Sequence, residues 1–94
     1  MISVQFHDGV VSLCDKELLG KRFEDSKHSL FVTERFYKGK FMNRKGVIKI
    51  LENADSINLV GTKIVKIALE EGFITQENIL MIQGVPHVQI YTFQ

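Results

Sequence analysis

Residues 56–72 read SINLVGTKIVKIALEEG, and this stretch decides the fold. Residues 56–60, with Ile57, Leu59 and Val60, predict a short buried strand. The remainder predicts a helix that Gly61-Thr62 opens and Gly72 ends. Its apolar residues fall on one helical face: Ile64, Val65, Ala68 and Leu69. A buried strand followed by an amphipathic helix is typical of a domain that packs helices on a sheet.

A second amphipathic helix is predicted just before this strand. Asn43 is a suitable N-cap, and the helix is expected to run to about Ala54. Its apolar face has the spacing i, i+1, i+4 and i+7 and consists of Val47, Ile48, Leu51 and Ala54.

The N-terminal residues predict a β-hairpin. Apolar and polar residues alternate over residues 2–6, and a second apolar run covers residues 10–14. Asp8-Gly9 lies between them and favours a tight turn, because both residues tolerate positive φ. After the hairpin, Asp15 is expected to cap a single helical turn over residues 16–19, which Gly20 ends.

The remaining elements are short. Residues 30–32 predict a third strand, and residues 38–40 an exposed turn. Thr75 is expected to cap a short turn before the apolar residues 79–82. Residues 84–86 predict a turn, and the alternation from Val88 to Phe93 predicts a final strand. The chain is therefore predicted to be a single compact domain over residues 1–94, of α/β (α+β) class, with an N-terminal β-hairpin, a mixed sheet and two main helices.

Bulk composition agrees with a globular domain. The chain has 94 residues, 45% of them hydrophobic, and a single proline. Its apolar runs are too short to span a membrane, and its first residues lack the layout of a signal peptide. Cys14 is the only cysteine, which fits a reducing compartment. These features predict a cytoplasmic protein.

Positive charge is concentrated in one part of the chain. Residues 16–49 have a net charge of +6, whereas the rest of the chain has −5. Within residues 35–49, RFYKGKFMNRKGVIK, six cations and three aromatic rings occur without an acidic residue. Cations among aromatic rings suit RNA, because they contact phosphates while rings stack on unpaired bases. The predicted phosphate contacts are Arg35, Lys38, Lys40, Arg44 and Lys45.

Aromatic and acidic residues refine this prediction. Tyr37 is the expected stacking ring, whereas Phe36 and Phe41 are expected in the core. Glu70 and Glu71 are expected on a solvated surface that faces away from RNA. The same cations also fit a merely solvated face, so the pattern is suggestive rather than specific.

A second candidate site lies at the turn Asn58 to Lys63. A helix that follows a strand presents free backbone N–H groups, and its dipole favours an anion. Gly61 would let a ligand approach the backbone, and Thr62 would cap the helix or donate a hydrogen bond. Asn58 would orient the loop, and Lys63 completes the predicted anion site. The alternative is that Gly61 permits close packing and Thr62 is an ordinary cap.

His87 and Cys14 are the remaining chemical candidates. Pro86 restrains Val85 to an extended conformation, so His87 would leave a rigid turn as an acid–base group, a metal ligand or an RNA contact. The alternative is a histidine that bonds a backbone carbonyl, and the isomer of the Val85–Pro86 bond stays open. Cys14 would need a nearby histidine to act as a nucleophile, and an apolar strand favours a core role. One cysteine and three scattered histidines lack metal-ligand spacing, so neither a metal nor a cofactor is expected.

Four blocks of the sequence resemble a known family. They are CDKELLGK (14–21), ERFYKG (34–39), NLVG (58–61) and GVPHVQ (84–89), in that order and spacing. They are similar to the archaeal domain of unknown function 424 family. The resemblance implies a compact α/β protein of archaeal cells with an association to RNA or translation and without an established catalytic role. The positions it singles out as site candidates are Asp15, Gly20, Arg35, Tyr37, Asn58, Gly61 and His87.

The leading hypothesis is therefore a small accessory protein that binds ribosomal or transfer RNA through a basic-aromatic face, with a protein partner in a ribonucleoprotein. One alternative is an enzyme or binding domain for a phosphorylated small molecule, with its site at Asn58, Gly61, Thr62 and His87. The other is a protein-interaction module, in which the basic face docks an acidic partner or an exposed final strand pairs with another chain.

Overall fold

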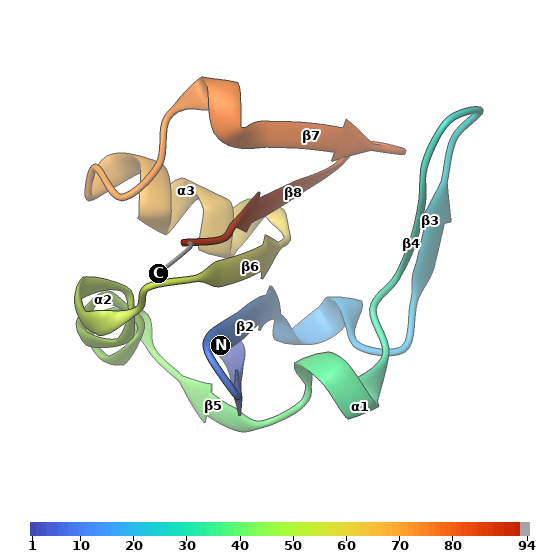
Figure 1. Ribbon diagram of the computed structural model, residues 1–94. Helices are drawn as coiled ribbons and strands as arrows, with labels where there is room; N and C mark the ends of the chain where they lie inside the picture. Colours follow the sequence, from blue (N-terminus) through green and yellow to red (C-terminus); the bar gives the residue numbers. More distant parts are fainter. Residues whose placement is uncertain (93–94) are drawn as a thin grey trace.

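A six-stranded mixed sheet forms the centre of the molecule (Figure 1). The computed structural model describes residues 1–92. The strand order is β5-β1-β2-β6-β8-β7, and every pair is antiparallel except the parallel pair β2–β6. The strands are β1 (Ile2–His7), β2 (Val10–Asp15), β5 (Lys40–Met42), β6 (Ile57–Val60), β7 (Ile79–Ile82) and β8 (Val85–Ile90).

The two main helices cover one face of this sheet. They are α2 (Arg44–Asn53) and α3 (Thr62–Glu70), and both follow the predicted boundaries closely. Alternate strand residues such as Leu13 and Leu59 pack against them and are fully buried. This helix-on-sheet layer makes the larger part of the hydrophobic core.

The other face is covered in part by smaller elements. These are α1 (Glu34–Tyr37) and a separate two-stranded sheet of β3 (Arg22–Glu24) and β4 (Ser29–Phe31). They bury a second apolar cluster around Cys14, Val32 and Val60. Figure 1 shows β3 and β4 as an arm beside the main sheet. Because β6 is covered on both faces, all four of its residues are buried.

Local patterns predicted the N-terminal hairpin and the start of α2. The hairpin pairs His7 with Val10 around the Asp8-Gly9 turn. The Asn43 side chain accepts a hydrogen bond from the backbone N–H of Gly46, as expected of an N-cap. Short 3-10 turns also occur near the two turns predicted after Asp15 and Thr75: they are η1 (Lys16–Leu18) and η2 (Gln76–Asn78).

Residues 22–42 contain elements that the sequence pattern did not reveal. β3 and α1 were not predicted, because each is only a single turn or a few residues long. Residues 38–40 do not form an exposed turn, since Lys40 begins β5 and pairs with Val4. Gly39 packs so closely on β1 that a Cβ there would collide with the Val4 carbonyl oxygen.

The C-terminal prediction also needs correction. The turn lies at Gln83-Gly84, and Pro86 belongs to β8 rather than to the turn. No cis peptide bond occurs in residues 1–92, so the Val85–Pro86 bond is trans. β8 lies between β6 and β7 and is not an exposed strand; β5 and β7 are the sheet edges. β8 begins at Val85, before the predicted start at Val88, and ends at Ile90, so Tyr91 and Thr92 do not extend the strand as predicted, whereas Phe93 lies outside the described residues.

Candidate nucleic-acid interface

The basic segment folds into α1, β5 and the first half of α2, which follow one another along the lower side of the molecule in Figure 1. All six of its cations are exposed, and we call the five other than Arg44 the basic ridge: Arg35, Lys38, Lys40, Lys45 and Lys49. Within residues 1–92, Lys38 alone among these has an acidic partner, Glu34, at 3.7 Å. Both groups of that pair are exposed, so the ion pair is weak.

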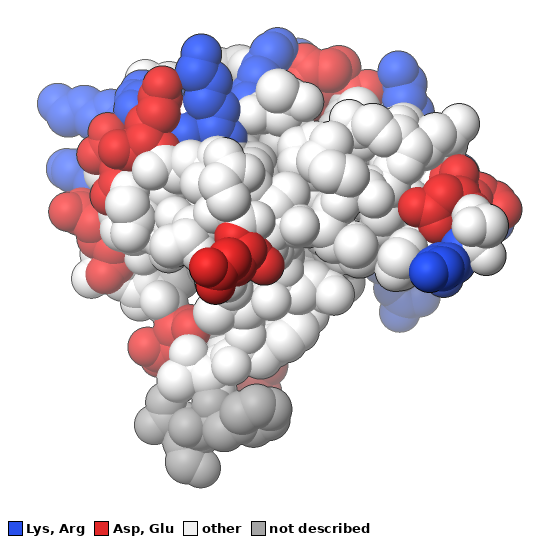
Figure 2. All heavy atoms as spheres, turned by 90° about the horizontal axis from the view of Figure 1, so that it is seen from above, with Lys and Arg blue, Asp and Glu red and all other residues white. Residues whose placement is uncertain are grey.

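The opposite edge of the sheet looks different. Figure 2 views the molecule from the side of β7, and the centre of this surface is largely uncharged apart from an acidic group, with no lysine or arginine near it. Lysines and arginines gather toward its border, interspersed with acidic groups. A polyanion would therefore find its cations away from β7.

Arg44 differs from the ridge cations and corrects one sequence prediction. Its guanidinium nitrogens donate to the carboxylates of Glu70 at 3.0 Å and Glu71 at 2.9 Å. These hydrogen bonds raise the pKa of Arg44. Glu70 and Glu71 thus neutralise part of the basic segment instead of facing away from it, and a phosphate would have to compete with these two exposed ion pairs for Arg44.

Tyr37 is not an exposed stacking ring. Its side chain is only 4% exposed, and its hydroxyl donates to Asn58 Oδ1 at 2.8 Å. Burial raises the pKa of the Tyr37 hydroxyl above its usual range. The ring therefore belongs to the core, and the predicted stacking on an RNA base is excluded for this conformation.

The two neighbouring phenylalanines are partly buried. Phe36 packs against the second core cluster, and the His7 ring stacks on it at 4.3 Å between centroids. His7 Nε2 donates to the Phe36 carbonyl at 2.8 Å, which ties α1 to the end of β1. Phe41 lies under the Lys16 ammonium, which is 4.9 Å from the ring centroid.

Phe6 is the exposed aromatic ring that the sequence did not single out. It is 55% exposed, although it lies in the apolar alternation of β1. Phe6 lies at the end of β1 beyond the pairing with β5, which reaches only Ile2 to Val4, so no strand flanks Phe6 on this side of β1. Lys40 pairs with Val4, so Lys40 and Phe6 lie on the same face of the sheet.

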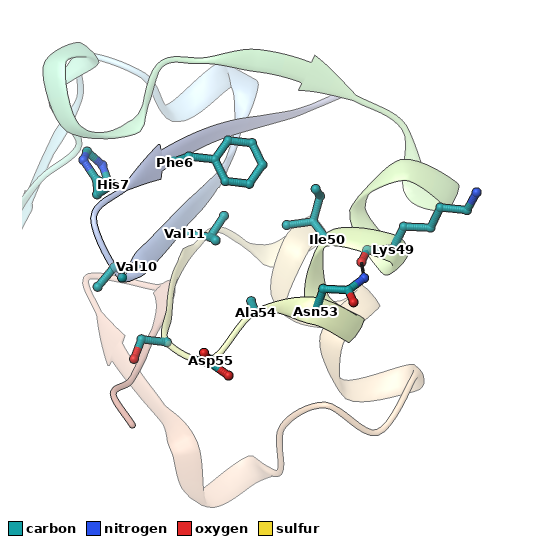
Figure 3. Close-up of a pocket in the computed structure, with 11 residues that line it drawn as sticks. Phe6, His7, Val10, Val11, Lys49, Ile50, Asn53, Ala54 and Asp55 are labelled. Atoms are coloured by element: carbon teal, nitrogen blue, oxygen red, sulfur yellow. Dashed lines mark hydrogen bonds between the residues drawn. The ribbon is translucent and has the colours of Figure 1, made fainter. Parts of the chain in front are cut away.

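A groove of about 420 Å³ opens beside this ring (Figure 3). It lies between the β1–β2 turn and the C-terminal half of α2. Its apolar lining comes from both sides, with Phe6 and Val11 from the hairpin and Ile50 from α2. Lys49 and Asp55 lie among the polar lining residues. Sequence spacing gave no signal for this groove, because it depends on how the hairpin and α2 meet.

The predicted anion site at the start of α3 is occupied by the chain itself. The Asp15 carboxylate accepts hydrogen bonds from the backbone N–H groups of Lys63 and Ile64, each at 2.9 Å. Asp15 is therefore the cap of α3 and not of the turn that follows it, where no side-chain cap is present. Burial raises the pKa of the Asp15 carboxyl, against the lowering effect of these two amides.

Gly61 and its neighbours serve this cap. Gly61 has φ 120° and ψ 153°, and a Cβ there would lie 2.5 Å from Asp15 Oδ2. Thr62 is exposed, and the Lys63 ammonium donates to Glu17 at 2.8 Å. The close-packing interpretation of Gly61 therefore fits the geometry, and the amides expected to hold a ligand hold Asp15.

Asn58 and His87 are brought together as the phosphate-ligand hypothesis required. His87 Nε2 lies 3.2 Å from Asn58 Oδ1, which also accepts the Tyr37 hydroxyl. Both residues are nearly inaccessible, however, with exposures of 4% and 8%, and burial lowers the pKa of His87. This arrangement is a buried hydrogen-bond network, and it is separate from the groove.

Cys14 is a core residue. It is fully buried, and burial raises the pKa of its thiol to about 12, so the nucleophilic thiolate is disfavoured. Over residues 1–92, no cluster of three or more His, Cys, Asp or Glu side chains gathers in a metal-binding arrangement. The same residues include no helix that is long and apolar enough to cross a membrane.

Similarity to known proteins places the chain in a family. A family model described as "Protein of unknown function (DUF424)" matches residues 4–93. The chain belongs to the DUF424 family. A crystal structure of an uncharacterized conserved protein from the archaeon Methanopyrus kandleri has a similar fold to this DUF424 chain, with a TM-score of 0.69 and 29% identity over 96% of this chain and 88% of the other. No match is found among curated proteins.

The site candidates that the family resemblance singled out fall mostly inside the molecule. Asp15 and Gly61 form the cap of α3, whereas Tyr37, Asn58 and His87 form the buried network. These motif positions of the DUF424 chain are explained by the fold. The exposed candidates for binding are the basic ridge and the groove beside Phe6.

Proposed function

We propose that this DUF424 protein binds RNA through the basic ridge and the adjoining groove, as an accessory protein of ribosomal or transfer RNA. The observation on which this proposal rests is the exposure of the ridge cations beside an exposed aromatic ring. Lys45 and Lys49 are four residues apart on α2, so they project from the same side of the helix. Lys49 also lines the groove that contains Phe6.

Charge and burial favour RNA over the small-molecule alternative. The helix amides that would hold a phosphate hold Asp15, and the side chains of Asn58 and His87 are buried. The ridge cations, by contrast, lie on consecutive elements at the surface. An extended polyanion matches such a row of cations better than a compact phosphorylated metabolite does.

Recovery of the tagged protein from its native cells, followed by sequencing of the bound RNA at low and high salt, tests the proposal. With about five phosphate contacts on a single strand, affinity should fall about 10²-fold between 50 and 200 mM salt. Lys40→Ala/Lys45→Ala/Lys49→Ala should abolish recovery, whereas Lys66→Ala on α3 is the matched control for loss of an exposed lysine. An RNA affinity that does not depend on salt, or an equal loss of recovered RNA in both variants, would contradict the proposal.

A second candidate function is pairing with another protein strand at β7. This edge strand, ILMI, has no charged residue, and Leu80 and Met81 are 41% and 53% exposed. Natural edge strands are commonly protected by charges or proline, which β7 lacks. Light scattering after gel filtration checks this candidate. A complex or oligomer that Met81→Lys dissociates supports it, whereas a protein that stays monomeric and binds no other chain contradicts it.

A further inference from the structure

We propose that the groove beside Phe6 holds one unpaired base of the bound RNA, so that the protein selects single-stranded over duplex RNA. The inference rests on the proposed function and adds the class of RNA. Three features of the groove support it: an accessible ring, a charged group at each side, and a lining held in place by the fold.

The accessible ring is Phe6. Base–aromatic stacking needs an exposed ring face beside a cationic path for the backbone. Phe6 provides the ring with 55% exposure, and Lys49 lines the same groove. Figure 3 shows the Phe6 ring over the apolar side chains of Val11 and Ile50, so a base that enters meets apolar surface.

The charged groups give the groove a direction. Lys49 projects from α2, and Asp55 lies below Ala54 at the other end of the view in Figure 3. A phosphate is attracted to the ammonium, whereas the amino group of a base donates to a carboxylate, as cytosine N4 does to Asp or Glu. A nucleotide offers this pair of groups, an anion and a base edge, on one molecule.

The groove lining is held by hydrogen bonds, one within the lining and two from Thr92 outside it. Asn53 Nδ2 donates to the Lys49 carbonyl at 2.9 Å, which fixes the amide at the end of α2. The Thr92 backbone N–H donates to Ser56 Oγ at 2.9 Å, and the Thr92 hydroxyl donates to the Asp55 carbonyl. A prearranged lining of this kind lowers the entropy cost of binding.

Single-strand preference follows from how bases are presented to the groove. In a duplex, each base is stacked on both faces and its pairing edge is occupied, so only a splayed base reaches a pocket of this size. The ridge cations, in contrast, contact phosphates of either form. Single-strand preference is therefore assigned to the groove and overall affinity to the ridge.

The test uses a 12-nucleotide cytidine-rich RNA, alone and annealed to its complement, with the full chain. Phe6→Ala should weaken single-strand binding roughly 5- to 150-fold, as expected for the loss of one stacked base, and leave duplex binding unchanged. Phe31→Ala is the matched control, because Phe31 is a 46% exposed phenylalanine on β4 and away from the groove. Equal losses for both RNA forms, or no loss in Phe6→Ala, would overturn the inference while leaving the ridge proposal standing.

A fluorescent variant reports the stacking directly. The sequence contains no tryptophan, so Phe6→Trp places a single indole at the groove and Phe31→Trp places one on the arm. Bound single-stranded RNA should quench the fluorescence of the indole at the groove and not that of the indole on the arm. The variant also retains an aromatic ring, so loss of binding in Phe6→Ala through misfolding is distinguished from loss of stacking.

A separate titration covers the case in which the natural chain binds no RNA and the proposed function fails. Cytidine 5′-monophosphate is then added to millimolar concentration while the backbone amide resonances are followed. Shifts centred on Ile50 and Ala54, lost in Phe6→Ala, would retain the groove as a nucleotide site. Unchanged resonances at these two positions would overturn it.

Discussion

Replacing Gly61 with alanine should unfold much of the population under conditions in which the natural chain is stable. The backbone of Gly61, at φ 120° and ψ 153°, lies in a region that is essentially restricted to glycine. The new Cβ would also lie 2.5 and 2.7 Å from the two Asp15 carboxylate oxygens. The carboxylate must then leave the Lys63 and Ile64 amides that it caps.

The magnitude follows from these two costs. Backbone strain contributes about 1–3 kcal/mol and loss of the N-cap about 0.5–2 kcal/mol, so a total cost of roughly 1.5–5 kcal/mol is expected. For a domain of this length, about 1 kcal/mol lowers Tm by roughly 4–8 °C, which predicts a decrease of roughly 6–40 °C. Circular dichroism during thermal and urea unfolding measures both quantities.

Two further variants make the test specific. Gly84 also has positive φ, but nothing lies within 4 Å of a Cβ there, so Gly84→Ala should cost only about 1–2 kcal/mol. Asp15→Ala removes the obstacle, so Gly61→Ala should cost less in that background than in the natural chain. Equal destabilisation by Gly61→Ala and Gly84→Ala would refute the steric argument.

The remaining predictions concern buried groups and the paired arginine. Because burial raises the pKa of Cys14 to about 12, a thiol reagent at pH 8 should label only the unfolded protein, and rapid labelling of the native protein would contradict this. His87 has a lowered pKa, so below about pH 6.5 the unfolded chain binds a proton that the folded chain does not. As the pH falls through this range, the free energy of unfolding should therefore fall by up to about 1.4 kcal/mol per pH unit. Urea titrations at several pH values should show this decrease, and a smaller one in His87→Gln. Tyr37→Phe should cost about 0.5–1.5 kcal/mol of stability in urea unfolding, since it removes the shorter of two hydrogen bonds to the buried Asn58 Oδ1, without changing RNA affinity in a binding titration. Glu70→Gln/Glu71→Gln should strengthen RNA binding in the same titration, because it releases the guanidinium that these carboxylates hold.

The parts of the fold that sequence reasoning predicted are those set by neighbouring residues. The apolar stripe of α3, the Asn43 cap of α2 and the Asp8-Gly9 turn each lie within a few residues, and each was predicted. Asp15 shows where this logic fails. The sequence assigned it to the turn that follows it, whereas its amide partners lie 48 and 49 residues further along the chain.

Burial could not be predicted for the aromatic residues of the candidate site. Tyr37 stands among lysines in the sequence, yet a hydrogen bond to β6 places it in the core. Phe6 stands in an apolar alternation, yet it is exposed at the end of β1 that β5 does not flank. Both outcomes depend on strand order and register, which composition and spacing do not specify.

The parallel pair β2–β6 has a consequence for the chain as it leaves the ribosome. The β1–β2 hairpin and β5 pair with one another from the first 42 residues, but β2 gains its second neighbour only when residues 57–60 appear. Until then the free side of β2 exposes unpaired backbone groups next to Leu13 and Cys14, residues that are fully inaccessible in the finished fold. A nascent chain that paired these first strands early would therefore have an open sheet edge at its centre until residues 57–60 and the first turn of α3, which binds Asp15, are added.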